Sequence, residues 1–157
     1  MESWIHYLKG DATAPKGSGA KYIVHLCNNL GLWGAGFVLA ISKKWPDPKN
    51  NYLHWYHSQK DFTLGNIQFV PVENDITVIN MVAQKGIEPE NELPPIRYEA
   101  LQECLTQVAK AAKRNNASVH MPRIGSGLAG GTWHEVEKII QKTLIINQIP
   151  TYIYDLN

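Results

Sequence analysis

Residues 121–133, which read MPRIGSGLAGGTW, constrain the fold of this chain more than any other stretch. The apolar run at residues 118–124 predicts a buried strand, and it leads into four glycines within seven residues. Thr132, with Glu135 three residues later, matches the S/T-x-x-E capping box that marks a helix start. Such a loop presents free backbone N–H groups and the positive end of a helix dipole. It therefore favours a bound phosphate or diphosphate, although a simple glycine-rich connector would show the same pattern.

A second strand, glycine-rich loop and helix occur earlier in the chain. Residues 22–27 read YIVHLC, a nearly continuous apolar run that is typical of a buried strand. Residues 28–36 (NNLGLWGAG) form the loop, and residues 37–45 then have a helical periodicity that Pro46 ends. His25 lies inside this strand, where a histidine is more often a hydrogen-bonded core residue than a catalytic one.

The remaining segments complete an alternating α/β pattern. Strands are predicted at residues 4–8, 67–72, 77–81 and 151–154, and helices at residues 50–60, at residues 96–114 and after Thr132. The order β-β-α-α-β-β-α-β-α-β predicts a three-layer α/β/α fold with a mixed central sheet. The length of 157 residues predicts a single domain over residues 1–157. Because loops after parallel strands share one edge of a sheet, the two glycine-rich loops should form one crevice.

Composition argues against several classes of protein. The net charge of +1 predicts no broad basic face, so extended nucleic acid is not expected as a partner. No apolar run approaches 18 residues and no signal peptide is recognisable, so no membrane attachment is expected. Cys27 and Cys104 are the only cysteines, which is typical of reduced thiols in a cytoplasmic protein. His54 and His57 lack further matched ligands, so neither a metal ion nor another cofactor is expected.

Several short motifs together resemble the macro domain family over nearly the full length of the chain. They are Lys9-Gly10-Asp11, His25-x-Cys27-Asn28, Gly31-x-Trp33-Gly34-x-Gly36, Met121-Pro122-x-Ile124-Gly125-x-Gly127-Leu128 and Tyr154-x-Leu156. Each motif is weak alone, whereas the combination is specific. Within the family, the chain most resembles the branch of the terminal ADP-ribose protein glycohydrolase and the yeast-type ADP-ribose 1''-phosphate phosphatase. Small stand-alone bacterial members of that branch look most similar.

The resemblance implies a crevice for ADP-ribose or its derivatives, including ADP-ribose attached to a macromolecule. Asp11 would accept a hydrogen bond from the adenine amino group, assisted by the Ala12 N–H, and Tyr154 would pack against the adenine. Asn28 would face the distal ribose. From the residues alone, Asp11 beyond a strand end fits an Asx turn or a helix cap at least as well as a ligand contact.

The resemblance also implies that the two glycine-rich loops hold the diphosphate between them. The residues implied are Trp33, Gly34, Ala35, Gly36 and Phe37 in one loop and Ile124, Gly125, Ser126, Gly127, Leu128 and Ala129 in the other. Side chains introduced at Gly125 or Gly127 are therefore expected to block the ligand and leave the fold intact.

The chain departs from the glycohydrolase branch at two positions. That branch uses a lysine nucleophile in the loop after the strand near residues 78–82, and an acidic residue in the later glycine-rich loop. Gln84 and Ala129 stand at these positions, and Lys85 is displaced by one residue. We therefore expect that the chain does not cleave protein-linked ADP-ribose by the lysine route.

Three functions remain open from the sequence. The first is a binding module for free or protein-linked ADP-ribose. The second is an enzyme that removes the phosphate of ADP-ribose 1''-phosphate or the acyl group of O-acetyl-ADP-ribose, with His25 and Asn28 as candidate catalytic residues. The third is a nucleotide-binding or RNA-end-binding protein without ADP-ribose specificity, which the near-neutral net charge disfavours.

Overall fold

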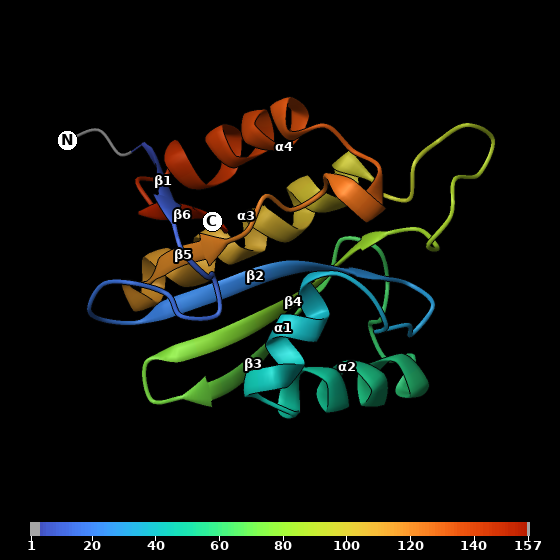
Figure 1. The fold of residues 1–157 in the computed structure, drawn as a ribbon, viewed down its shortest axis with the longest axis horizontal. Helices are drawn as coiled ribbons and strands as arrows, with labels where there is room; N and C mark the ends of the chain where they lie inside the picture. Colours follow the sequence, from blue (N-terminus) through green and yellow to red (C-terminus); the bar gives the residue numbers. More distant parts are fainter. Residues whose placement is uncertain (1–3, 157) are drawn as a thin grey trace.

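The computed structural model describes residues 4–156, which form one six-stranded sheet between two layers of helices (Figure 1). The strands are β1 (Ile5–Lys9), β2 (Lys21–Asn28), β3 (Ile67–Glu73), β4 (Ile76–Gln84), β5 (Ser118–Met121) and β6 (Thr151–Asp155). The helices are α1 (Phe37–Lys44), α2 (Asp47–Ser58), α3 (Tyr98–Asn115) and α4 (Trp133–Ile140), with the short helical turns η1 (Gly127–Ala129) and η2 (Gln141–Ile145). The predicted order of strands and main helices is confirmed.

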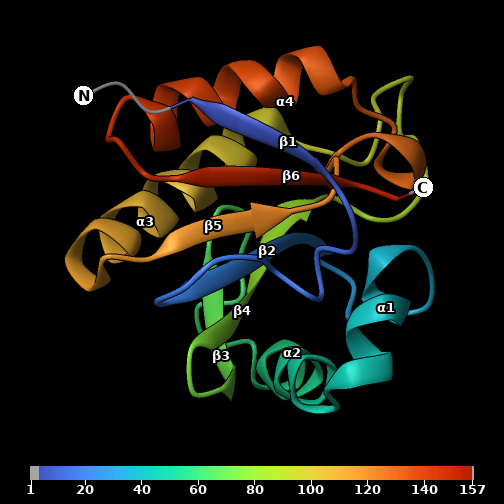
Figure 2. The ribbon, with the colours of Figure 1, turned by 60° about the vertical axis from the view of Figure 1, so that its left-hand side comes forward.

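The strand order in the sheet is β1-β6-β5-β2-β4-β3. Every neighbouring pair is parallel except β3 and β4, which are antiparallel, so the predicted mixed sheet is confirmed. Figure 2 shows β1, β6 and β5 side by side and running in the same direction. Because these strands, β2 and β4 all end at one edge, the loops that follow β1, β5, β2 and β4 lie along that edge in this order.

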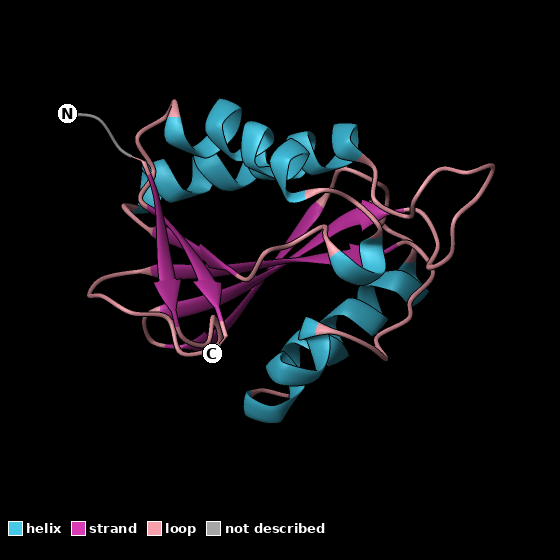
Figure 3. Cartoon of the chain, turned by 45° about the horizontal axis from the view of Figure 1, so that its top comes forward, coloured by secondary structure: helices cyan, strands magenta, loops and turns pink. Residues whose placement is uncertain are grey.

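The helices cover both faces of the sheet, α3 and α4 on one side and α1 and α2 on the other (Figure 3). Alternate residues of β2 and β4 therefore enter two different cores: Val24 and Ile79 pack on the α3 side, and Ile23 and Val78 on the α1 side. All four side chains are fully buried. This double burial explains why residues 22–27 read as a continuous apolar run instead of an alternating one.

The capping box predicted before α4 does not form. Thr132 precedes the helix with extended dihedral angles (φ −109°, ψ 140°), but its side chain makes no capping hydrogen bond. Its backbone N–H donates to the Tyr98 hydroxyl at 3.0 Å, and Glu135 lies 3.5 Å from the ammonium of Lys138. The helix begins where the sequence predicts, and the Tyr98 hydroxyl of α3 satisfies the Thr132 N–H that Glu135 would accept in a capping box.

Two predicted boundaries shift by a few residues. The strand predicted at residues 118–124 ends at Met121, because Pro122 has no N–H to donate to a neighbouring strand. The helix predicted to begin at residue 96 begins at Tyr98, because residue 96 forms a β-bridge with the last residue of β4. Within residues 4–156, no helix is both long enough and apolar enough to cross a membrane.

Candidate functional site

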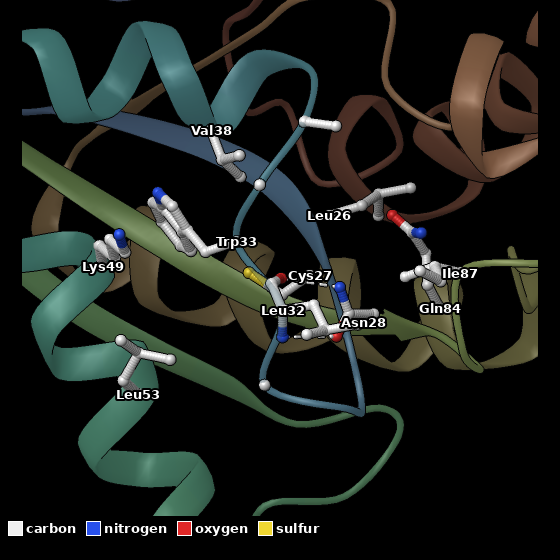
Figure 4. Close-up of a pocket in the computed structure, with 13 residues that line it drawn as sticks. Leu26, Cys27, Asn28, Leu32, Trp33, Val38, Lys49, Leu53, Gln84 and Ile87 are labelled. Carbon is white, nitrogen blue, oxygen red and sulfur yellow. Dashed lines mark hydrogen bonds between the residues drawn. The ribbon is translucent and has the colours of Figure 1, made fainter.

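Two adjoining hollows lie at the carboxyl edge of the sheet. The central hollow, of 310 Å³, lies between the end of β2, the start of α1 and residues 122–129. The lateral hollow, of 580 Å³, lies between β2, residues 31–35, α2 and the end of β4 (Figure 4). Leu26, Ala35, Val38 and Gln84 line both hollows, so the two lie side by side.

The central hollow brings together many of the residues that the sequence predicts for a ligand. They are His25, Ala35, Gly36, Phe37, Ile124, Gly125, Ser126, Gly127 and Ala129. Asn28, Trp33 and Gly34 line the lateral hollow instead. Asp11, Ala12 and Tyr154 line neither hollow, and the side chain of Leu128 lies outside the described part of the structure.

The loop at residues 125–131 closes on itself through its own backbone. Gly131 N–H donates to Gly125 O at 2.7 Å, and Gly130 N–H donates to Gly127 O at 2.9 Å. The φ angles of Gly125, Gly127 and Gly130 are 82°, 68° and 77°, a left-handed region that favours glycine. Within residues 4–156, the N–H groups of Gly125 and Gly127 make no hydrogen bond. The loop therefore has the free donors that an anion requires.

Gly125 and Gly127, which the sequence analysis expects to tolerate a new side chain equally well, have different surroundings in the structure. A Cβ on Gly127 would meet no atom within 4 Å, so this backbone is open to approach. A Cβ on Gly125 would lie 2.7 Å from Ile96 Cδ1 and 2.8 Å from Val136 Cγ2. The expectation that Gly125 can be replaced without harm to the fold is therefore wrong, because its missing side chain leaves room for the core.

Asn28 organises the loop after β2. Its Oδ1 accepts hydrogen bonds from the N–H groups of Leu30 (2.9 Å) and Leu32 (3.2 Å), and the Tyr52 hydroxyl lies 2.7 Å from Asn28 O and 2.9 Å from Asn28 Oδ1. Its Nδ2 donates to Leu32 O at 2.8 Å, and the Tyr52 hydroxyl also accepts from Gly31 N–H at 3.1 Å. The Asn28 amide therefore fixes the shape of the loop, and one of its two amide hydrogens remains for a ligand. Contact with a distal ribose stays a prediction.

His25 is the hydrogen-bonded core histidine that its position in the strand favours. Asn80 uses its amide nitrogen to donate to Pro48 O at 3.1 Å and to Gln68 Oε1 at 3.0 Å. Its Oδ1 must therefore accept, which makes His25 Nε2, at 2.6 Å, the protonated ring nitrogen. His25 Nδ1 is then a buried acceptor, and it has no partner among the described residues.

The environment of His25 keeps its ring uncharged. The side chain is 2% exposed, and the rings of Trp33 and Phe37 lie 5.3 and 6.2 Å from it. Burial lowers the pKa of His25 to about 4. At neutral pH the ring is therefore uncharged, with one buried acceptor nitrogen, and it is a weak base.

This buried neutral histidine predicts an acid-sensitive fold. The unfolded chain takes up a proton on His25 near pH 6.5, whereas the folded chain does so only near pH 4, so stability falls as the pH falls through this window. The shift corresponds to a loss of roughly 3 kcal/mol. Urea unfolding at pH 7 and pH 4.5 should show most of this loss, together with a loss from His120, whose pKa burial also lowers to about 4, and His25→Asn should remove only the part due to His25. An equal loss in the variant would contradict the assignment.

Cys27 adds no reactive thiol to the lateral hollow. Burial raises the pKa of its thiol, so the thiolate needed for nucleophilic attack is absent at neutral pH. Cys27 and Cys104 are both free and buried, and the cytoplasmic location that they suggest remains a prediction. Among residues 4–156, no group of three His, Cys, Asp or Glu side chains could hold a metal ion.

The residues predicted for adenine lie at the β1 end of the same edge. The Asp11 carboxylate accepts hydrogen bonds from the N–H and the hydroxyl of Thr13, both at 2.8 Å, so it forms the Asx turn that the sequence offered as an alternative. Tyr154 is 3% exposed, and its hydroxyl accepts from Lys16 N–H at 2.9 Å and lies 2.7 Å from His120 Nδ1. Contact of these residues with adenine stays a prediction.

Arg123 is a site residue that the sequence analysis missed. It lines the central hollow, and its guanidinium makes a two-point ion pair with Asp155 at 2.7 and 3.0 Å. The same group lies 5.0 Å from the Tyr7 ring and 5.3 Å from the Trp133 ring. The sequence did carry a signal for Arg123, because it is a positively charged residue inside the glycine-rich motif. Lys49 and Leu53 of α2 also line the lateral hollow, and nothing in the local sequence indicates this.

Comparison with known proteins agrees with this fold. The family model described as Macro domain matches residues 24–140. A structure of a protein of unknown function from Bacteroides thetaiotaomicron has a TM-score of 0.97 and 55% identity, and the match covers 98% of this chain and 99% of that one. The chromodomain-helicase-DNA-binding protein 1-like of Mus musculus is 33% identical over 96% of this chain, but the match spans only 17% of the mouse protein. The ADP-ribose 1''-phosphate phosphatase of Candida albicans is 27% identical over 88% of this chain and 92% of that protein.

Proposed function

We propose that this chain, which belongs to the macro domain family, binds ADP-ribose or an ADP-ribose derivative across the carboxyl edge of its sheet. The main support is the central hollow, where the open backbone of Gly127 and the free N–H groups of its loop face residues 35–37 of the other glycine-rich loop. Backbone donors arranged in this way suit a diphosphate. The name of the Candida albicans relative, an ADP-ribose 1''-phosphate phosphatase, supports the same class of ligand.

The strand order suggests how such a ligand would lie. Asp11 follows β1, the central hollow lies beside β5 and β2, and the lateral hollow lies beside β2 and β4. An extended ligand with its adenine near Asp11 and its diphosphate in the central hollow would direct its distal ribose toward Asn28 and Gln84. These two residues pair at the ends of their strands, beyond a register shift after Cys27. Binding to protein-linked ADP-ribose is part of the same proposal.

Replacement of Asp11 tests the adenine end of this arrangement. A hydrogen bond to a charged group contributes about 1.5–3 kcal/mol, so Asp11→Ala should weaken ADP-ribose binding roughly 10- to 100-fold in calorimetry. Because Asp11 also holds the turn with Thr13, Asp11→Asn is the control: its amide oxygen keeps the turn, and it should lose less affinity. Unchanged affinity in a folded Asp11→Ala protein would remove this residue from the site.

Hydrolysis at the distal ribose is the second candidate function. It is supported by the phosphatase relative and by His25, which lines the central hollow and whose buried Nδ1 has no partner among the described residues. The test is incubation with ADP-ribose 1''-phosphate, O-acetyl-ADP-ribose and an ADP-ribosylated protein, followed by measurement of ADP-ribose release. Binding without release would leave a binding module.

A further inference from the structure

Arg123 lies between the two ends of the proposed ligand. Its guanidinium is ion-paired with Asp155 at the end of β6, and its side chain also lines the central hollow beside β5 and β2. In the proposed arrangement, the adenine lies near Asp11 and the diphosphate lies in the central hollow. The adenosine ribose joins these two groups, so this arrangement places Arg123 beside the hydroxyl groups of that sugar.

The guanidinium of Arg123 keeps donors that the protein does not use. Its Nε and Nη2 donate to the two carboxylate oxygens of Asp155, and its Nη1 makes no hydrogen bond to any residue among 4–156. An arginine has five N–H donors, so three remain for a ligand. The side chain is 41% exposed, which leaves these donors accessible. A free planar fork of this kind suits the oxygens of a phosphate better than a neutral hydroxyl group.

Two aromatic rings hold this guanidinium in one orientation. It lies 5.0 Å from the centre of the Tyr7 ring and 5.3 Å from the centre of the Trp133 ring. Trp133 Nε1 donates to the Tyr7 hydroxyl at 3.0 Å, and that hydroxyl donates to the Glu137 carboxylate, so the rings are fixed to each other. A group that is oriented before binding loses less entropy when a ligand arrives. Arg123 is therefore a preorganised contact.

Two exposed lysines add positive charge at the same place. Lys9 is the register partner of Asp155 across β1 and β6, and the ammonium of Lys16 lies 3.2 Å from Lys9 O. Together with Arg123 they make three cations, against the carboxylates of Asp155 and Glu137. The electrostatic potential beside the adenosine ribose therefore favours an additional anion.

We propose that Arg123, with Lys9 and Lys16, binds a phosphate ester on the 2' hydroxyl of the adenosine ribose. The 2' hydroxyl is next to the carbon that carries the adenine, and Asp155 ties Arg123 to the adenine end of the edge. The ligand class is therefore a 2'-phosphorylated ADP-ribose, either free or as part of NADP⁺. This inference rests on the proposed function, because ADP-ribose must lie across the edge for its ribose to meet Arg123.

Calorimetry with ADP-ribose and ADP-ribose 2'-phosphate measures the proposed contact. Hydrogen bonds to a charged group change affinity by roughly 10- to 100-fold, so the phosphorylated ligand should bind at least about tenfold more tightly. The ratio of the two affinities should shrink as salt rises from about 50 mM to about 500 mM, because the contact is partly exposed. NADP⁺ should be preferred over NAD⁺ in the same way, and the tighter binder of NADP⁺ and ADP-ribose 2'-phosphate identifies the source of the phosphate.

Arg123→Gln should bring the ratio to within about twofold of one, whereas Arg123→Lys should keep part of it, because lysine retains the charge without the two-point contact. The ratio separates this contact from any change in ADP-ribose affinity, since Arg123 also lines the central hollow. Arg114→Gln is the matched control. It removes the same charge from an exposed residue in the last turn of α3 that lines neither hollow, so the wild-type ratio should survive.

The other outcomes distinguish the phosphate subsite from the proposed function. Equal or weaker binding of ADP-ribose 2'-phosphate by the wild type would overturn the subsite while ADP-ribose binding stands. An unchanged ratio in folded Arg123→Gln, or an equal fall in Arg114→Gln, would do the same, and circular dichroism checks the fold. If Arg123→Gln does not fold, an undiminished ratio in Arg123→Lys is the contradicting result. Tighter binding of adenosine 3',5'-bisphosphate than of adenosine 2',5'-bisphosphate would overturn the 2' assignment, and failure of every ligand to bind would overturn both proposals.

Discussion

Gly127→Glu should lower the affinity for ADP-ribose by at least about 100-fold, a loss of roughly 2.7 kcal/mol or more. The new side chain would start from the one glycine of the 125–131 loop that lines the central hollow and has open space around its Cβ position. The carboxylate would compete with the diphosphate for the free N–H groups and repel it. Calorimetry with ADP-ribose measures the loss.

Gly19→Glu is a matched control for this variant. Gly19 has a φ of 80°, close to the 68° of Gly127, and a Cβ on it would likewise meet no atom within 4 Å. The two substitutions therefore place the same charge on a backbone of similar positive φ, but only one of them lies at the central hollow. If both variants kept full affinity, the diphosphate would have to lie elsewhere; if both lost it equally, strain and charge would explain the result.

Wild-type protein should form no covalent lysyl adduct with ADP-ribose, whereas Gln84→Lys combined with Ala129→Asp should form one. Gln84 and Ala129 both line the central hollow, so the double variant would place an amine and an acid at the same site. The acid would supply a proton transfer worth roughly 10²- to 10⁴-fold in rate. Release of ADP-ribose from a modified protein should rise by about 100-fold over wild type.

Borohydride trapping followed by mass spectrometry locates any adduct. Lys85 lines neither hollow, and its ammonium lies 3.3 Å from Glu90 Oε1 in an exposed loop. Lys85→Ala should therefore leave ADP-ribose binding unchanged. An adduct on Lys85 in the wild type would show that the chain uses the lysine route from a different position.

The sequence could predict the two glycine-rich loops and the crevice because the relevant signals are local. Each loop directly follows an apolar run, and parallel strands necessarily end at one edge of the sheet. The predicted boundaries were accurate to a few residues for the same reason. Thr132 shows the limit: the helix begins there, but its N–H is satisfied by Tyr98 from a helix that the local pattern does not include.

The lateral hollow could not be predicted because it depends on strand order and on the placement of α2. Leu53 and Ile87 are more than 30 residues apart in the sequence, and they line opposite sides of one hollow because α2 packs against β4, the strand that Ile87 follows. Gly125 shows a second limit, because a glycine motif does not distinguish a residue open to a ligand from one that is small to make room for the core. The tautomer of His25 likewise depends on Asn80, which lies 55 residues away.

The bonds of Tyr52 give the two walls of the site different mechanical properties. Its hydroxyl joins α2 to Asn28 and to Gly31, so residues 28–31 and the helix form one stiff unit. The opposite wall includes Ile87 in the exposed segment 87–93, which follows the hydrogen bonds of Lys85 N–H to Pro95 O and of Gly86 N–H to Asn29 Oδ1. A ligand that enters or leaves the lateral hollow would therefore displace residues 87–93 and leave α2 in place. Amide hydrogen exchange should therefore be fast in the exposed segment around Ile87 and slow in α2, so that one wall of the site is rigid and the opposite wall is mobile.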